Sequence, residues 1–460
     1  MTKHSKKMNI VNNKSANFER QNRLVAGIDI GASSIFVCVG LSDGGQRVQE
    51  FSTFTKDLKA AIAWLKEHNI DSVAMESTGV YWIPVYDLIA QAGIEPVLVN
   101  AHHLKTVPGR KTDVKDCQWI QQLHSYGLLN GSFRPDDAGV IFRTYVRQRS
   151  NLVETASRQI QLMHKALIQM NIQLHQVLSN VAGVTGMSII RAIISGEQNP
   201  HILACLRDAR CQHNEEEVAK ALEGNFRKEL VFSLQQAVEA YDFFQKQIEA
   251  CENELKTILD DWNDKNKPNN NQSDDESEKK TANYQPKNKS AYNFDVATQM
   301  HNQLGVDLTD IPGIDGSTVM KIVAEIGTDM SAWPTEKHFA SWLGLCPGNK
   351  ISGGKILSGK TKPCANKAAQ ALRIAANATQ RTATALGAFF RRMKSRKGPM
   401  NAITATAHKI AIIIYSMIKN KQSFKDIGQD SYEQKYQERV VKNLKRKAKE
   451  LGYELVEAIV

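Results

Sequence analysis

The chain has 460 residues, which is too long for one hydrophobic core, so we expect two or three domains. Hydrophobic residues make up 42% of the chain, enough for ordinary globular packing. Its seven cysteines are odd in number and form no C-x-x-C pair, which suits a reducing cytosol and gives no zinc signature.

The net charge of +11 is unevenly distributed. Between Cys346 and Lys425 there are sixteen Lys or Arg residues and no Asp or Glu, so the rest of the chain is net acidic. A solvated surface usually mixes charges of both signs, whereas a surface that binds a polyanion gathers positive charge. This acid-free stretch therefore predicts binding to nucleic acid, in preference to a membrane or an acidic protein.

Neither the N-terminal residues nor the longest late apolar run predicts a membrane segment. Residues 1–23 are polar and basic without an apolar centre, so we interpret them as a disordered basic arm and not a signal peptide. The run Ile410–Ile418 has only nine residues, too short to span a bilayer. We expect a cytoplasmic protein without a membrane partner.

The first part of the chain alternates apolar runs with turn signals. Short strands are predicted at residues 24–30, 35–41 and 48–54, which form a meander. A helix, a strand, a helix, a strand and a helix follow, at residues 56–68, 72–75, 82–92, 95–99 and 113–126. This β-β-β-α-β-α-β-α order predicts a ribonuclease H-like α/β domain.

Four acidic residues fall at special places in that order. Asp29 lies inside the first strand, and Glu76 ends the fourth. Asp113 and Asp116 are three residues apart, so they share one face of the last helix. A carboxylate within an apolar strand is costly unless it is compensated, and Mg²⁺ favours such hard oxygen ligands. The set predicts a catalytic site for two Mg²⁺ ions, against the alternative of four unrelated surface or capping acids.

The middle of the chain carries two apolar seams with heptad spacing. The first comprises Val153, Ala156, Ile160, Met163, Leu167, Met170, Leu174 and Val177. The second comprises Leu230, Leu234, Ala237, Tyr241, Phe244, Ile248, Cys251, Leu255, Ile258 and Trp262. These helices could pair within one chain as an antiparallel hairpin or between two chains as a dimerisation arm. Residues 181–228 between them predict a helical insert, and the polar residues after Trp262 predict a linker.

Residues 308–327 predict a helix-hairpin-helix element, whose Pro312-Gly313 turn would present backbone N–H groups to a phosphate. Further on, Ser352 is followed by two glycines and surrounded by lysines, which makes it a candidate nucleophile toward a DNA phosphate. Ser358 is the rival serine. Alternatively, the segment around Ser352 is a basic loop that only binds the nucleic-acid backbone.

These parts together resemble the DEDD-type transposases of bacterial insertion sequences, the insertion-sequence-110 family. The resemblance runs from about residue 24 to residue 420. It is carried by Gly27–Gly31, Met75–Trp82, Asn100-Ala101, Lys111–Asp116, and the block Ile311–Leu372 with Trp342–Gly348, Ser352–Lys355 and Ala371–Arg373.

The resemblance implies a RuvC-like domain whose Asp29, Glu76, Asp113 and Asp116 bind Mg²⁺, and a transposase domain whose catalytic serine is Ser352. It also implies a recombinase that excises and inserts its element, guided by an element-encoded RNA, in the bacterial cytoplasm at the nucleoid. In such assemblies the acids of one protomer are thought to act with the serine of another, so we expect a dimer or tetramer held by the coiled coil. Contacts to nucleic acid are expected from Lys350, Lys355, Lys360, Lys362, Lys367, Arg373, Arg391 and Arg392.

The expected fold is thus α/β at the N-terminus and mostly helical beyond it. Its parts are a disordered basic arm (1–23), a RuvC-like DEDD domain (24–144), a coiled-coil domain with a helical insert (145–262), a polar linker (263–300), a helix-hairpin-helix and serine transposase domain (301–425) and a basic C-terminal helical tail (426–460).

Three other functions fit parts of the pattern. A nuclease like a Holliday-junction resolvase would use the same acids with water as nucleophile, and it would not need Ser352. A sugar-kinase or actin-like ATPase would explain Gly27–Ser34 as a phosphate hairpin, but a second phosphate loop is not found in the sequence. A nucleic-acid-binding protein without activity would leave the complete set of four acids unexplained.

Overall fold

The computed structural model describes residues 21–22, 24–41, 44–77, 79–100, 112–266, 290–361 and 363–456. The chain divides into two compact units, Met1–Arg134 and Pro135–Val460, and each is described by itself. Residues 1–20 of the predicted basic arm and most of the predicted linker lie outside the described residues.

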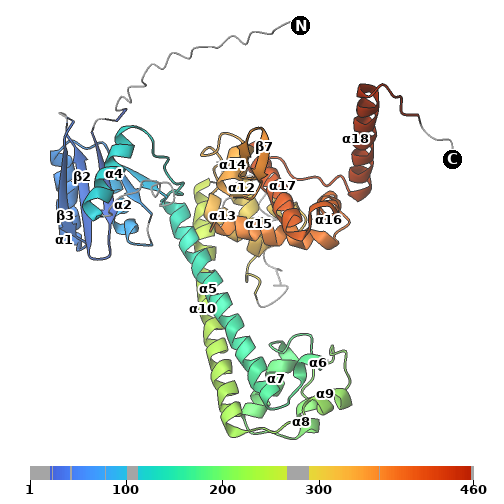
Figure 1. Ribbon diagram of the computed structural model, residues 1–460. Coiled ribbons are helices and arrows are strands. Elements are labelled where there is room, and N and C mark those ends of the chain that lie inside the picture. The colour runs from blue at the N-terminus through green and yellow to red at the C-terminus, as the bar shows by residue number, and fades with distance from the viewer. Residues whose placement is uncertain are drawn as a thin grey trace. The chain divides into compact units, whose positions relative to one another are not determined.

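The first unit is a five-stranded mixed sheet with helices on both faces (Figure 1). The sheet order is β3-β2-β1-β4-β5; the first three strands are antiparallel neighbours, and β4 and β5 run parallel to β1. The elements are β1 (Val25–Ile30), β2 (Ser34–Gly40), β3 (Gln46–Ser52), α1 (Thr55–Glu67), β4 (Ser72–Glu76), α2 (Trp82–Gln91), β5 (Glu95–Val99) and α4 (Asp113–Ser125). All begin and end within two residues of the predicted bounds. The architecture is consistent with the predicted ribonuclease H-like fold.

The two faces of this sheet pack against different helices because side chains alternate along a strand. Ile28 and Met75 belong to the core that includes Leu65 of α1 and Ile89 of α2. Their neighbours on the opposite face meet α4, where Ala74 packs against Ile120. The central strands β1, β2 and β4 are therefore buried on both sides, which explains their nearly continuous apolar runs, whereas the edge strand β3 is mostly polar and exposed.

The second unit begins with two long helices that pack side by side, α5 (Asp137–Gln169) and α10 (Lys228–Asn266) (Figure 1). They run antiparallel, because Phe142 meets Trp262 while Arg149, further along α5, meets Glu252, further back along α10. The intrachain hairpin, one of the two predicted arrangements, is thus the one present in this structure. The predicted first seam extends too far: α5 ends before Asn171, whose positive φ of 59° breaks the helix.

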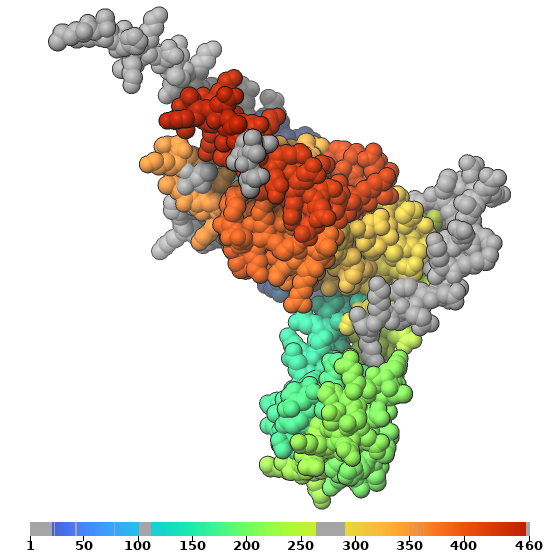
Figure 2. Space-filling model, turned by 90° about the vertical axis from the view of Figure 1, so that its right-hand side faces the viewer, coloured from blue at the N-terminus to red at the C-terminus, as the bar shows by residue number. Residues whose placement is uncertain are grey.

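The helical insert between α5 and α10 lies at the end of the long-helix pair, in the green part of Figure 2. Met170 and Leu174, assigned from sequence to the first seam, lie beyond α5 and belong to one core that the insert shares with Leu167 of α5 and Leu234 of α10. Its helices are α6 (Leu174–Val177), α7 (Val184–Ile194), α8 (Pro200–Ala204) and α9 (Glu215–Ala221).

The C-terminal part is a helical domain with one small hairpin. Its elements are α12 (Val296–Leu304), η1 (Leu308–Asp310), α13 (Gly316–Ile326), α14 (Glu336–Trp342), β6 (Lys350–Ser352), β7 (Lys355–Ser358), α15 (Lys367–Ala378), η2 (Thr379–Arg381), α16 (Ala385–Lys397), α17 (Pro399–Asn420) and α18 (Gln429–Glu450). By length and composition α17 could cross a membrane, but half of its apolar window is buried against α14, α15 and α16, as in the central helix of a folded domain.

Three predicted boundaries differ from the structure. Helix α5 begins at Asp137 and the second unit at Pro135, so the α/β unit ends about ten residues before the predicted limit at residue 144. Helix α12 begins at Val296, inside the predicted linker of residues 263–300, because Tyr292 and Phe294 just before it are buried. Helix α10 also continues to Asn266, past the predicted start of the linker at residue 263, so polar composition did not predict where packing ends or resumes.

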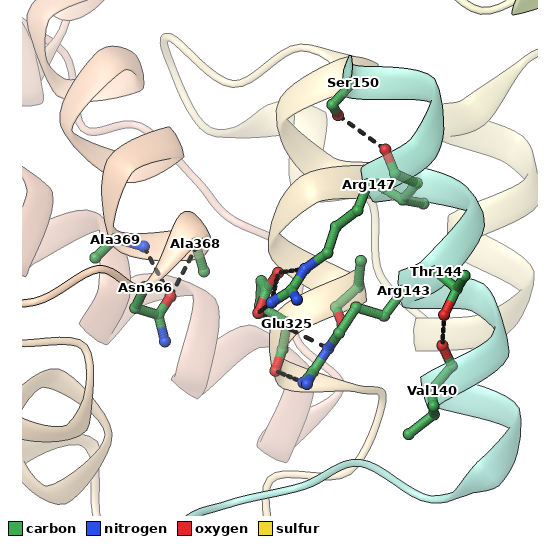
Figure 3. Close-up of polar contacts among 11 residues, drawn as sticks. Val140, Arg143, Thr144, Arg147, Ser150, Glu325, Asn366, Ala368 and Ala369 are labelled. Carbon is green, nitrogen blue, oxygen red and sulfur yellow. Dashed lines mark hydrogen bonds and ion pairs between the residues drawn. The ribbon is translucent and has the colours of Figure 1, made fainter. Parts of the chain in front are cut away.

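Two partly exposed arginines of α5 connect it to the C-terminal domain. Arg143 donates hydrogen bonds to the carbonyls of Ala324 and Glu325, and Arg147 donates to both carboxylate oxygens of Glu325, all at 2.9 Å (Figure 3). A bidentate pair of this kind fixes the relative orientation of the two side chains as well as their distance. These contacts hold α13 against α5.

Candidate active site

Asp29 and Glu76 lie level with each other on adjacent parallel strands. The register pairs Gly27 with Ala74 and Ile28 with Met75, so the next position along β1 is Asp29 and along β4 is Glu76. Alternation puts both on the face that α4 covers, because Ala74 packs there. Helix α4 carries Asp113 and Asp116 in its first turn.

The backbones of β1 and α4 are in close contact at Gly27, and this contact positions α4 over β1. A Cβ atom at Gly27 would lie 2.3 Å from the amide nitrogen of Gln121 and 2.5 Å from the carbonyl oxygen of Cys117, so only glycine fits. The Gln121 side chain donates to the Val25 carbonyl at 3.3 Å and accepts from Gln46 at 2.6 Å. These contacts hold the helix that carries two of the acids.

The other three acids act electrostatically on Asp29. The pKa of Asp29 is raised from 3.8 to about 6, first by burial and then by the charges of Asp116, Asp113 and Glu76. A hydrogen bond with the backbone of Ile30 opposes the shift. The fold therefore places Asp116, Asp113 and Glu76 close enough to Asp29 to raise its pKa, as their places in the sequence predict.

The donor set suits Mg²⁺ chemically, because it consists of carboxylate oxygens, and a cation among them would offset the repulsion felt by Asp29. Within the described residues, however, no group of three or more His, Cys, Asp or Glu side chains is close enough to hold a metal ion. Electrostatic interactions act over longer distances than metal coordination. The four acids are therefore close enough to affect the pKa of Asp29 but not close enough to bind one metal ion together. The assignment of Mg²⁺ to them stays a prediction.

The candidate nucleophile lies at the tip of a tight hairpin. Ser352 pairs with Lys355 across a two-residue turn made by Gly353 and Gly354, whose φ angles are 54° and 77°. A two-residue hairpin of this kind needs positive φ at both central positions, which explains the Gly-Gly sequence. The side chain of Ser352 is exposed, and no described residue forms a hydrogen bond with its hydroxyl.

The rival serine is placed differently. Ser358 ends β7, is half-buried, and its hydroxyl accepts a hydrogen bond from the backbone N–H of Lys360 at 3.4 Å. Its oxygen therefore serves the local turn, whereas that of Ser352 is open to a ligand. This difference favours Ser352, which composition alone did not separate from Ser358.

The basic residues predicted to contact nucleic acid fall into two groups. Lys355, Lys360 and Lys367 are exposed; Lys362 and the side chain of Lys350 lie outside the described residues. By contrast, the arginines have partners within the protein.

Arg391 donates to the carbonyls of Gln380 and Thr382 at 2.9 Å and to the Gln429 side chain at 2.7 Å. The guanidinium of Arg392 lies over the ring of Tyr436, 3.8 Å from its centre. Arg373 is half-buried, with a long contact of 3.5 Å to the Gly344 carbonyl. These contacts give the arginines a packing role that the sequence did not indicate.

The predicted phosphate cradle at the Pro312-Gly313 turn is already capped. Asp315 is the N-cap of α13, and its carboxylate accepts from the N–H of Thr318 at 2.8 Å. An acid at this place competes with a phosphate for the same donor. Residues 308–310 form a single 3-10 turn, so the first helix of the predicted element is much reduced. Gly313 serves packing instead, since a Cβ there would lie 2.4 Å from the carbonyl of Ala375.

Sequence reasoning missed the positioning residues. Gly27 and Gln121 hold α4, while Arg149 and Glu252 form a buried pair at 2.6 Å between the long helices. A glycine inside an apolar strand was the available signal for the first contact. The pair of Arg149 and Glu252 gave no local signal, because the two residues are about a hundred positions apart in the sequence.

An acid-bearing α/β sheet, joined in one chain to a basic helical domain with an exposed serine, is the combination expected of a DNA transposase. A family model for DEDD-type IS110 transposases matches residues 26–172, and one described as "Transposase IS116/IS110/IS902 family" matches residues 307–391. Together they span about half of the chain, and the protein belongs to the IS110 family of transposases. No curated protein matches it.

Proposed function

We propose that this transposase excises and inserts its element by direct phosphoryl transfer to Ser352, with the acids Asp29, Glu76, Asp113 and Asp116 as the metal-binding half of the site. The observation that carries the proposal is the placement of Ser352 at the open tip of a two-glycine hairpin within an acid-free stretch. An anionic DNA strand can approach this tip without meeting a carboxylate of that stretch.

The proposed step conserves the energy of the phosphodiester. The Ser352 oxygen forms a bond to phosphorus, the bond from phosphorus to the leaving sugar oxygen breaks, and that oxygen takes up a proton. The serine proton passes to a base, which the stretch from Cys346 to Lys425 does not supply as a carboxylate. Attack by a sugar hydroxyl of another strand then releases the serine and rejoins DNA without ATP.

The carboxylates would hold Mg²⁺, which supplies positive charge against the charge that develops on the phosphoryl oxygens. Asp29 is the central member, since burial and its three acidic neighbours raise its pKa. Because the acids and the serine belong to different units, we propose, as the family resemblance implies, that they meet in an assembly of two or four protomers.

An RNA encoded by the element is the proposed guide, in the bacterial cytoplasm at the nucleoid. Support comes from the family resemblance and from the exposed lysines of the acid-free stretch, which suit either nucleic acid.

The competing function is a water-using nuclease with the same acids. Strand-cleavage and strand-joining assays with element-end DNA in Mg²⁺ separate the two. We expect Asp29→Ala and Asp116→Ala to bind DNA with nearly normal affinity and to cleave nothing. Full cleavage by either variant would refute the metal-site part of the proposal, and recombination by Ser352→Ala would refute the nucleophile.

A further inference from the structure

Beside the base of the serine hairpin, the C-terminal domain contains an open groove of about 800 Å³. One wall is the hairpin base around Lys360, and the other walls are α16 and the first half of α17. The groove belongs entirely to described residues of the second unit. It has no part in the acid site or in the serine turn.

The lining of the groove combines two chemistries. Its apolar surface includes the ring of Phe389 and the thioethers of Met393 and Met400. Lys360, Lys397 and Lys409 line it as well, with the amino group of Lys409 4.5 Å from the centre of the Phe389 ring, and none of its residues is acidic. Apolar, polarizable surfaces beside fixed positive charge complement a flat base joined to an anionic phosphate.

Polar side chains are also present to meet the edge of a base. His408, Asn401 and Thr404 of α17 line the groove. Burial, and then the charge of Lys409, lower the pKa of His408, so its ring is neutral at pH 7 and offers one donor and one acceptor. Asn401 donates to the carbonyl of Lys397 at 2.6 Å, which leaves its amide oxygen as an acceptor.

We propose that this groove binds one unstacked nucleotide of the nucleic-acid strand that passes Ser352, with its base among Phe389, Met393 and Met400 and its phosphate at the lysines. The proposal rests on the proposed function and adds to it a site for a base. From Lys355, opposite Ser352, to Lys360 the chain advances five residues, about 16 Å in extended conformation. That distance equals about five nucleotides along a B-form strand and fewer along a stretched one.

Short single-stranded oligonucleotides that carry 2-aminopurine provide the probe, because stacking on neighbouring bases quenches its emission, which rises when the base leaves that stack. The measurement uses the full-length protein without Mg²⁺, so no strand is cut and the result does not depend on recombination. DNA and RNA versions identify which strand supplies the base, and an abasic version removes the base while keeping the phosphates.

Met400→Asp is the informative variant, because this side chain is 75% exposed and its replacement leaves the core intact. Ile374→Asp on α15 is the matched control, with 69% exposure and the same change of charge outside the groove. We expect Met400→Asp to weaken binding about tenfold, as expected for loss of a stacked base. The same variant should abolish the rise in emission, whereas Ile374→Asp should change both the affinity and the emission much less.

A rise in emission with DNA, with RNA or with both supports the site and identifies the kind of strand that supplies the base. Equal weakening by the two variants, or equal affinity for the normal and abasic oligonucleotides, would overturn the proposal. Either result leaves the strand-joining assay with Ser352→Ala unaffected, so failure of the groove and failure of the nucleophile are distinguishable.

Discussion

After burial, the charge of Asp116 on α4 is the largest cause of the raised pKa of Asp29 on β1. Eighty-six residues of sequence separate the two carboxylates, and the fold places Asp116 where its charge opposes the ionisation of Asp29. Repulsion of this kind is typical of functional sites, and a divalent cation is the ligand that we propose for these carboxylates.

The pH dependence of stability tests this cluster without any assay of activity. Because the folded pKa of Asp29 is about 6 and its ordinary value is 3.8, its stability contribution is complete below 3.8 and is lost as pH rises through 6. The full shift corresponds to about 3 kcal/mol, reduced to about 1–2 kcal/mol because Asp29 is only half-buried. We therefore expect Asp29→Asn to stabilise the metal-free α/β unit at pH 7 and to have little effect near pH 4. Denaturant unfolding at both pH values measures this, and equal stability of the two proteins at pH 7 would contradict it.

Gly27→Ala should displace α4 and disrupt the acid cluster. Its new methyl group would meet backbone atoms of Gln121 and Cys117 that have little room to move. We expect a loss of about 1–3 kcal/mol in the free energy of unfolding and weaker stabilisation by Mg²⁺ in thermal melts. Gly131→Ala is the control, since its Cβ would meet only Val97 Cγ1 at 3.6 Å. Similar stability of the two variants would show that α4 does not depend on the close approach.

The buried pair between α5 and α10 should be costly to break from one side. Arg149 and Glu252 are 2% and 4% exposed, and the carboxylate also accepts from the N–H of Asn293 at 3.0 Å. Arg149→Met leaves Glu252 buried without its partner, so we expect a loss of about 3–5 kcal/mol. Adding Glu252→Gln should recover part of it in a double-mutant cycle. Arg158→Met, in an exposed pair with Glu154, is the control with little effect.

Substitutions in the apolar seams cannot test the oligomer that the seams predict. Leu167 and Ile248 are buried within the single chain, so an Asp at either place would disrupt the long-helix pair whatever its partners. We expect light scattering to give a mass of at least two 51.3 kDa chains for the unaltered protein with nucleic acid. A monomer under all conditions would contradict the assembly that brings the acids and the serine together.

Local pattern predicted the α/β unit almost completely. Apolar runs and turn signals such as Ser42–Gly45 are short-range features, so the strand bounds and the placement of Asp29 and Glu76 could be read directly. The end of α5 at Asn171 could not, because the apolar spacing continues into residues that pack in the insert. Contacts over long separations, such as Arg147 with Glu325, become visible only in three dimensions. The cap that Asp315 forms on α13 is local, and an Asp just before a helix was the available signal for it.

Mapping of a covalent DNA adduct tests the account most directly. Protein incubated with labelled element-end DNA in Mg²⁺ is denatured, digested and sequenced by mass spectrometry to locate the phosphorylated residue. The account predicts phosphoserine at Ser352, no adduct with Ser352→Ala although DNA binding is kept, and an adduct still formed by Ser358→Ala. An adduct at Ser358 or at a tyrosine, or strand joining by Ser352→Ala, would contradict it.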